Sequence, residues 1–245
     1  MKPVIIVQAR MTSTRLPGKV MLPVLGTPLL EYQIRRLQRV RAAEVICIAC
    51  TTNEIDQPIV DLGNRLGVEI YRGPELDVLA RYYEAARMIG AEHVVRVTSD
   101  CPVIDPDETG RVIDFYLARM DKLDYASNAL VRSYPRGMDT EIFSFGALRA
   151  AYLEAKEDFE REHVTPFIYR RPERFRMENF SFELDKGDYR LTVDTSEDFE
   201  LISRVISALY PSNHEFSRHD VLELLGHHPD WLEINGHVRQ KALGE

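Results

Sequence analysis

The 245-residue sequence has few of the features that mark secreted, membrane-spanning or nucleic-acid-binding proteins. Its three cysteines are an odd number without framework spacing, which suits a reducing compartment and predicts a cytoplasmic protein. No apolar run approaches the roughly 20 residues that span a bilayer, and the N-terminus has no signal-peptide pattern. The formal net charge of -8 argues against a general nucleic-acid binder, which carries a basic face. We therefore expect neither membrane insertion nor a nucleic-acid partner.

Several catalytic and nucleotide-binding motifs are also missing. Gly18-Lys19 is not part of a Walker A loop, because Ser13 stands where that motif has glycine and Val20 where it has Ser or Thr. There is no G-x-G-x-x-G either, so ATPases and dinucleotide-dependent dehydrogenases are disfavoured. Cys47 and Cys50 match C-x-x-C, but they lie in an apolar run where strand alternation sends them to opposite faces, so we expect core residues.

The first half of the chain alternates between apolar runs of strand length and segments of helical period. Hydrophobic residues make up 44% of the chain, enough for a sizeable core in one large domain. Strands are expected at 4–9, 44–51, 68–71 and 93–98. One helix is expected to begin at Thr27-Pro28 and another at Pro58, and two more are expected at 76–89 and 107–120. This alternation predicts an α/β fold with a mostly parallel central sheet flanked by helices. Ligands of such sheets bind at the carboxyl ends of the strands.

The alternation is looser after residue 120. Strands are expected at 125–130, 139–145, 175–184 and 189–193, and helices at 145–155, at 160–170 and from Thr195 onward. A polar helical segment follows Pro211. We expect a single α/β domain over residues 1–210 and a helical C-terminal extension over 211–245 that is not an independent domain. The extension either completes the site of a second copy in a homodimer or packs on its own core.

The most informative stretch, QARMTSTRLPGK (residues 8–19), connects the first expected strand to the first expected helix. It combines cations, hydroxyls and a Pro-Gly turn. Arginine offers a planar fork for phosphate, lysine a mobile charge, and backbone N–H groups before a helix also bind phosphate oxygens. A solvated basic loop is the alternative, but the position after the first strand favours a polyphosphate site. The predicted nucleotide-binding residues are Ala9, Arg10, Thr12, Ser13, Arg15 and Lys19.

Two aspartates at the ends of expected strands complement this loop. Asp100 follows the strand 93–98, and Asp194 follows the strand 189–193. Each has a simpler reading, since Asp100 can cap the turn before Pro102 and Asp194 can be a helix N-cap residue. Together with a cationic phosphate loop, however, two carboxylates form a coherent set, because Mg²⁺ sites use one or two carboxylates plus phosphate oxygens. We predict that Asp100 and Asp194 bind Mg²⁺.

A second polar group of residues lies in the middle of the chain. In the stretch YPRGMDTE, Arg136 and Asp139 flank a glycine turn, and Asp139 and Glu141 would share one side of a strand. They either recognise hydroxyls of a polar second substrate or line a solvated face. His163 either reaches the pocket or stays on a helix surface. We predict substrate-binding roles for all four of these residues.

Several blocks of this sequence resemble one family. The resemblance is to the cytidylyltransferases that make CMP-activated sugars, such as CMP-Kdo and CMP-sialic acid synthetases, and above all to the spore-coat polysaccharide biosynthesis protein F branch. It covers nearly the whole chain. The blocks that carry it are QARMTSTRLPGK, RVTSDCPVIDP, YPRGMDTEIFSF, REHVTPFIY, RLTVDTSEDFELI and INGHVRQKAL.

The resemblance implies a nucleotide-diphospho-sugar transferase, Rossmann-like fold, with CTP as donor and Mg²⁺ as cofactor. Arg10 and Lys19 match the cations that hold the triphosphate, and Asp100 and Asp194 match the two metal-binding aspartates. CMP-Kdo synthetases have Gln-Gly-Asp where this chain has Thr98-Ser99-Asp100, which keeps the metal ligand but loses any contact of the glutamine. The acceptor-side residues are not shared cleanly, so neither Kdo nor sialic acid is inherited as acceptor.

We therefore expect an enzyme that transfers CMP from CTP to a hydroxyl of a sugar or related polyol acid, for surface polysaccharide biosynthesis. Arg10, Lys19 and Asp100 are the expected catalytic residues. One alternative is a glycosyltransferase of the same fold that uses a nucleotide sugar. The other is a non-catalytic nucleotide-binding subunit of a polysaccharide assembly.

Overall fold

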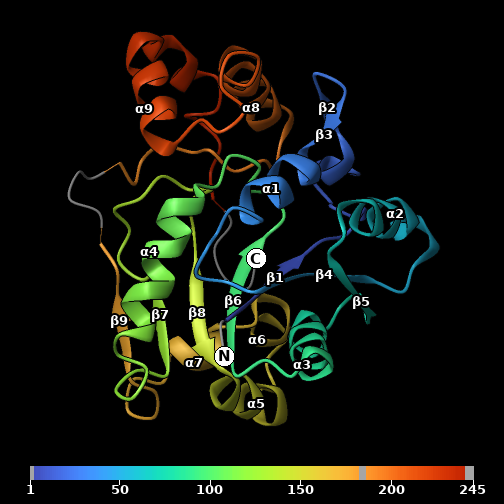
Figure 1. Ribbon diagram of the computed structural model, residues 1–245, viewed down its shortest axis with the longest axis vertical. Helices are drawn as coiled ribbons and strands as arrows, with labels where there is room; N and C mark the ends of the chain where they lie inside the picture. The colour runs from blue at the N-terminus through green and yellow to red at the C-terminus, as the bar shows by residue number, and fades with distance from the viewer. Residues whose placement is uncertain (1–2, 182–185, 241–245) are drawn as a thin grey trace.

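The computed structural model describes residues 3–181 and 186–240, which form a central sheet wrapped by helices (Figure 1). In spatial order its strands are β5 (Glu69–Gly73), β4 (Val45–Thr51), β1 (Val4–Gln8), β6 (His93–Thr98), β8 (Glu141–Ser144), β7 (Tyr125–Ser127) and β9 (Met177–Asn179). Strand β8 runs antiparallel to both of its neighbours, and the other pairs are parallel. The predicted α/β class with a mostly parallel sheet is confirmed.

The sheet changes its direction of growth between β1 and β6. From β1 the chain proceeds to β4 and β5 on one side, and then returns to place β6 on the other side of β1. The parallel registers set Gln8 between Ala49 and Thr98. Ligands of open parallel sheets bind in the crevice at the carboxyl ends of the strands beside such a switch point. The loops after β1 and β6, which carry the predicted phosphate and metal residues, begin at this edge.

Helices cover both faces of the sheet. One face packs against α1 (Leu29–Leu37), α2 (Gln57–Leu66) and α4 (Pro106–Leu117), and the other against α3 (Val78–Ile89), α5 (Phe145–Glu154) and α7 (Pro166–Tyr169). Along β1, Ile5 and Val7 belong to the first core and Val4 and Ile6 to the second, as the alternation of a strand requires. None of the described helices is long and apolar enough to cross a membrane.

A third apolar cluster joins the last part of the chain to the sheet edge. Helices α8 (Ser196–Leu209) and α9 (Arg218–His227) lie together at one end of the molecule, shown in orange and red in Figure 1, and are followed by η3 (Pro229–Glu233). Their apolar side chains pack with Leu29 and Tyr32 of α1. The buried guanidinium of Arg36 in α1 donates hydrogen bonds to the carbonyls of Ile104 and Phe216. The segment after residue 210 therefore packs on the core of its own chain.

The entrance to the first helix differs from the prediction. Thr27 and Pro28 do not begin the helix but form β3 (Thr27–Pro28), which pairs with β2 (Pro23–Val24). Leu25 and Gly26 between these strands adopt positive φ angles of 49° and 78°, the combination that closes a tight hairpin. The extended backbone of Pro28, at φ -59° and ψ 147°, makes it the N-cap residue, and α1 begins at Leu29.

Three later elements were also predicted wrongly. The expected strand at 189–193 is an irregular segment that makes an isolated bridge between Arg136 and Arg190. The expected helix at 160–170 is divided into α6 (Asp158–His163) and α7, because Val164 adopts a φ of 70° that a helix cannot continue. The expected strand at 175–184 shortens to β9, and its residues 182–185 lie outside the described residues.

The two cysteines of the C-x-x-C match lie in the core, as predicted. Cys47 and Cys50 belong to the clusters on opposite faces of β4. Both are free and buried, and burial raises the pKa of the Cys50 thiol to about 11. A thiol that stays protonated at neutral pH is a poor nucleophile and metal ligand.

Gly137 is essential for bringing the turn at residues 135–138 against the segment before α8. Its φ is +97°, and a Cβ atom here would lie 2.6 Å from the backbone carbonyl of Leu191. We expect Gly137→Ala to destabilise the protein by about 2–4 kcal/mol through strain and overpacking, visible as a lower midpoint of thermal unfolding. Gly110→Ala in α4 is the matched control: its Cβ meets open space and should leave stability unchanged or raise it by about 0.5–1 kcal/mol. Equal melting temperatures for Gly137→Ala and wild type would contradict this reading of the turn.

Candidate active site

A cavity of about 720 Å³ opens at the switch point, at the carboxyl edge of β1 and β6. Its walls come from the loops after these two strands, from the region around β8, from α6 and α7, and from the segment before α8. It brings together nearly all of the predicted site residues: Ala9, Arg10, Ser13, Arg15, Lys19, Asp100, Arg136, Asp139, Glu141, His163 and Asp194. The exception is Thr12, whose hydroxyl donates a hydrogen bond to Glu75.

The loop after β1 is held in shape by backbone bonds and by one buried carboxylate. Gly18, at a φ of 69°, donates its N–H to the carbonyl of Met11 at 2.8 Å, which closes the loop on itself. The N–H of Met11 donates to Asp56 at 2.7 Å, and the same carboxylate accepts from the hydroxyl of Thr51 at the end of β4. The short helix η1 (Lys19–Met21) follows directly. The cations of this loop are therefore presented from a fixed backbone.

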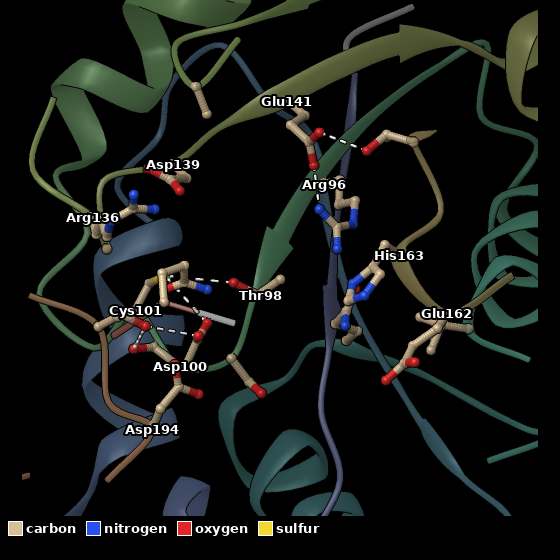
Figure 2. A pocket seen from close by; sticks show the side chains of 18 of the residues that line it. Arg96, Thr98, Asp100, Cys101, Arg136, Asp139, Glu141, Glu162, His163 and Asp194 are labelled. Carbon is tan, nitrogen blue, oxygen red and sulfur yellow. Dashed lines mark hydrogen bonds and ion pairs between the residues drawn. The ribbon is translucent and has the colours of Figure 1, made fainter. Parts of the chain in front are cut away.

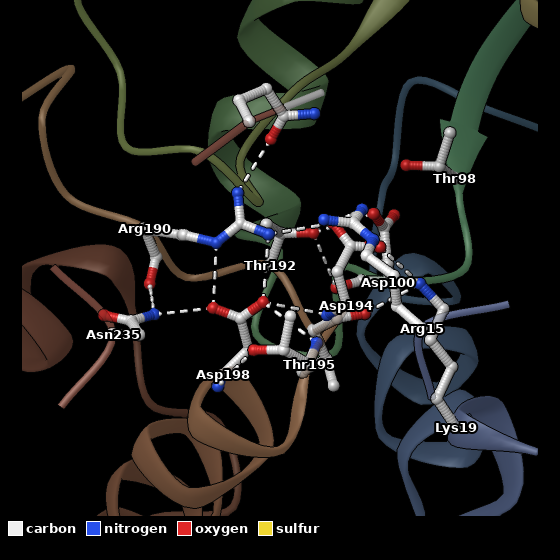
Figure 3. Close-up of polar contacts among 12 residues, drawn as sticks. Arg15, Lys19, Thr98, Asp100, Arg190, Thr192, Asp194, Thr195, Asp198 and Asn235 are labelled. Atoms are coloured by element: carbon white, nitrogen blue, oxygen red, sulfur yellow. Dashed lines mark hydrogen bonds and ion pairs between the residues drawn. The ribbon is translucent and has the colours of Figure 1, made fainter. Parts of the chain in front are cut away.

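The two predicted metal-binding aspartates lie on one wall of the cavity (Figure 3). The hydroxyl of Thr192 donates to the Asp100 carboxylate at 2.7 Å, and the N–H of Val193 donates to the Asp100 carbonyl at 2.8 Å. These bonds attach the irregular segment before α8 to the loop after β6. Asp100 and Asp194 are thus brought to the same wall by cross-links between two loops and not by a pair of strand ends.

Asp194 is surrounded by cations. Lys19 Nζ donates to its Oδ1 at 2.8 Å and to the carbonyl of Val193 at 2.7 Å, and Arg15 lies 2.8 Å from its Oδ2. The N-cap residue of α8 is Thr195, which forms a capping box with Asp198, so the reading of Asp194 as a helix cap is wrong. Its carboxylate is turned to the loop cations of the predicted phosphate site.

Asp100 is half-buried, and its carboxyl group is ionised at neutral pH. Burial by itself would raise the pKa of this carboxyl, but the charge of Lys19 and the hydroxyls of Thr98 and Thr192 outweigh it, so the pKa lies below its usual value. The neighbouring Cys101 has a pKa well above its usual value because of burial and the Asp100 charge. The site therefore presents carboxylates and not a thiolate.

These carboxylates fit a divalent cation that is shared with a phosphate ligand. Among residues 3–181 and 186–240, no group of three or more His, Cys, Asp or Glu side chains is placed to hold an ion on its own. Mg²⁺ retains several waters and binds through one or two carboxylates and substrate phosphates. Asp100 and Asp194 fit that set, with the cations Arg15 and Lys19 beside them.

The far wall of the cavity is built around a buried ion pair (Figure 2). Glu141 pairs with Arg96, and it also accepts hydrogen bonds from the hydroxyls of Tyr125 and Thr165, each at 2.7 Å. With three partners inside the protein, Glu141 primarily orients Arg96, whose Nε is buried without a partner among the described residues. Sequence reasoning missed Arg96, although a charge inside the apolar run HVVRVT was a usable signal.

The remaining predicted acceptor-side residues line the cavity on two sides: Arg136 and Asp139 near Asp100, and His163 on the wall of Arg96 (Figure 2). Asp139 precedes β8 and forms a two-pronged ion pair with Arg132, with distances of 2.7 and 2.8 Å. Arg136 lies beside it, and His163 lies beside Arg96 (Figure 2). Burial and then the charge of Arg96 lower the pKa of His163, so its imidazole is neutral at neutral pH. Together these side chains offer both hydrogen-bond donors and acceptors to a polar ligand.

The fold and the site together define an α/β nucleotide-binding protein, and comparisons with known proteins name its family. A family model described as cytidylyltransferase matches residues 4–221. The spore coat polysaccharide biosynthesis protein SpsF of Bacillus subtilis is 30% identical over 235 residues, covering 92% of this chain and 94% of that protein. An uncharacterized protein of Methanocaldococcus jannaschii is 34% identical over 251 residues, covering 100% of this chain and 99% of that protein. The chain belongs to the cytidylyltransferase family.

A solved structure supports the same assignment. The cytidylyltransferase from Leptospira borgpetersenii serovar Hardjo-bovis is 33% identical to this chain, and the match covers 99% of both chains with a TM-score of 0.91. The resemblance found in the sequence blocks is thereby confirmed, and so is the enzyme class.

Proposed function

We propose that the protein transfers CMP from CTP to a hydroxyl of a sugar or related polyol acid and releases pyrophosphate, with Mg²⁺ as cofactor, in a cytoplasmic step of surface polysaccharide biosynthesis. The observation that supports this most directly is the wall on which Arg15 and Lys19 meet Asp194 at 2.8 Å, with Asp100 beside them. A triphosphate needs cations, and a metal bound to it needs carboxylates. Both are present at the sheet edge where ligands of this fold class bind.

In the proposed reaction the acceptor hydroxyl attacks the α-phosphorus of CTP. A bond forms between the acceptor oxygen and that phosphorus, and the bond to the oxygen that bridges to the β-phosphorus breaks. Pyrophosphate leaves with the electron pair of the broken bond, and the hydroxyl proton passes to solvent water. Arg10, Arg15 and Lys19 stabilise the negative charge that grows on the α-phosphate and on the leaving pyrophosphate. Asp100 and Asp194 would hold the Mg²⁺, which when bound neutralises phosphate charge. The protein therefore acts mainly by alignment and charge stabilisation.

Other side chains that line the cavity suit the acceptor. Arg136 supplies a guanidinium group for a carboxylate, which Arg binds with a planar fork. The neutral His163 and the hydroxyl of Tyr169 line the same cavity and offer hydrogen bonds to sugar hydroxyls. The cavity of about 720 Å³ leaves room for a nucleotide and a small second substrate together.

The test is a pyrophosphate-release screen of the purified protein with CTP, UTP, ATP and GTP, in Mg²⁺ and in EDTA. Acidic sugars, amino sugars and small polyol acids serve as acceptors. We expect release only with CTP and Mg²⁺, and only with an acceptor that carries a suitable hydroxyl. A glycosyltransferase would give no pyrophosphate and would bind a nucleotide sugar more tightly than CTP. A non-catalytic subunit would bind CTP without turnover on any acceptor. Either result would overturn the proposal.

A further inference from the structure

The C-terminal segment after η3 reaches the wall that holds Asp194 (Figure 3). Asn235, which is 2% exposed, donates both amide hydrogens: to the Asp198 carboxylate at 2.8 Å and to the carbonyl of Arg190 at 2.9 Å. Gln240 accepts a hydrogen bond from Arg190 Nη1 at 2.7 Å and lines the cavity itself. These contacts join residues that are 37 to 50 positions apart. Asn235 and Gln240 thus take part in building this wall.

Arg190 connects this segment to Asp194. Its Nε and Nη2 donate to the two oxygens of Asp198 at 2.8 and 2.9 Å, and Nη2 also donates to Asp194 Oδ2 at 2.9 Å. Arg190 is 5% exposed and Asp198 is fully buried. Asp198 additionally accepts from the backbone N–H of Asp194 at 3.0 Å. Both the backbone and the carboxylate of Asp194 are therefore held by one buried ion pair.

Burying an ion pair destabilises the folded protein unless the remaining donors and acceptors of both side chains also form hydrogen bonds. Here Asn235 fills a position on Asp198, and Gln240 fills one on Arg190. The guanidinium of Arg190 is planar and forms hydrogen bonds through all three of its nitrogens, so its orientation is fixed. Its contact with Asp194 then determines where that carboxylate points. Arg15 and Lys19 remain on the cavity side of the same carboxylate, where a nucleotide would meet them.

We propose that the C-terminal segment is part of the catalytic centre: Asn235 and Gln240 hold Arg190, and Arg190 positions the Asp194 carboxylate for the metal-bound triphosphate. This inference rests on the proposed function, because it concerns the same site. Asn235, Gln240, Arg190 and Asp198 are positioning residues. The competing explanation is that the network only fastens the extension to the domain.

The discriminating measurement is calorimetric binding of CTP to the full-length protein, with Mg²⁺ and separately with EDTA. Partners that orient metal ligands change metal affinity by about 10–100-fold when they are removed. We expect Asn235→Ala to weaken CTP binding in Mg²⁺ by about 10–100-fold and binding in EDTA far less. His237→Ala, an exposed change in the same segment, is the matched control and should bind as wild type does in both buffers.

Two further variants keep the test decisive if Asn235→Ala unfolds. Gln240→Ala removes an exposed side chain and should weaken binding in Mg²⁺ by about 10-fold, as expected for loss of a hydrogen bond to a charged group. Arg190→Lys retains the charge but cannot reach two carboxylates with a fork, so it should fold and still lose Mg²⁺-dependent binding. If these variants had lower melting temperatures but bound CTP in Mg²⁺ as the wild type does, the inference would be overturned. The network would then only attach the extension to the domain. If the wild type itself bound no CTP in Mg²⁺, the proposed function would fail instead, and the two failures are thus distinguishable.

Discussion

Replacing Asp100 by asparagine is expected to lower kcat by about 10²–10³-fold, the usual effect of losing one preorganised charge contact. Asp100 carries a carboxylate whose pKa lies below its usual value in spite of burial, and asparagine of nearly the same shape removes the charge alone. The hydroxyl of Thr192 can still donate its hydrogen bond to the side-chain amide oxygen of the asparagine. The fold should therefore survive, and the loss should appear in turnover measured by pyrophosphate release. Extra Mg²⁺ should restore it only in part.

The control for this variant is Asp107→Asn, which makes the same chemical change at an exposed position in the first turn of α4. It should keep wild-type turnover. Asp194→Asn should also lose most of the activity, but it additionally leaves Arg15, Lys19 and Arg190 without their shared counter-charge. A loss of stability is expected there, which makes Asp100 the cleaner position. Turnover of Asp100→Asn within threefold of wild type would remove this residue from the site.

The central sheet and the position of the cationic loop at its carboxyl edge could be predicted because their signals are local. Strands buried on both faces give continuous apolar runs, and the glycines that end α2 and α3 adopt φ angles of 68° and 74° that favour glycine. The loop after β1 carries its charges within a dozen residues. Asp194 lines the cavity as expected, but the segment before it is not the strand from which this was inferred. What brings it to Asp100 is the bond between Thr192 and Asp100, which joins residues 92 positions apart.

The ion pairing in the far wall and the C-terminal contacts were not predicted, because they depend on which charges find partners inside the fold. From the sequence, Glu141 would be expected to have a free carboxylate, but Arg96 on the neighbouring strand forms an ion pair with it. Arg190 reads as a surface cation, yet it is buried between Asp194 and Asp198. A pattern of residue types does not reveal such pairings. The residues that position a site are accordingly harder to find than those that contact its ligand.

Replacing Lys19 by methionine is expected to reduce kcat/KM for CTP by about 10²–10³-fold and to leave the fold intact. Methionine has a similar length and fills the space of the lysine stem, so the change removes chiefly the ammonium group. That group lies 2.8 Å from Asp194, and its charge is the largest of the influences that lower the pKa of Asp100, so it serves both aspartates. Arg15 and Arg190 still neutralise Asp194, which is why stability should change little. The measurements are steady-state kinetics and thermal unfolding.

The matched control is Lys186→Met, a lysine in an irregular segment whose ammonium lies 5.1 Å from the ring of Tyr189 and outside the cavity. It should keep wild-type kinetics. Lys19→Arg adds a more informative comparison, because it preserves the charge but replaces a compact ammonium by a broader fork. If the charge alone matters, this variant retains most of the CTP affinity. If the short contact to the carbonyl of Val193 also matters, Lys19→Arg loses turnover while it still binds CTP. Wild-type CTP affinity and rate in Lys19→Met would show that the loop after β1 does not hold the triphosphate.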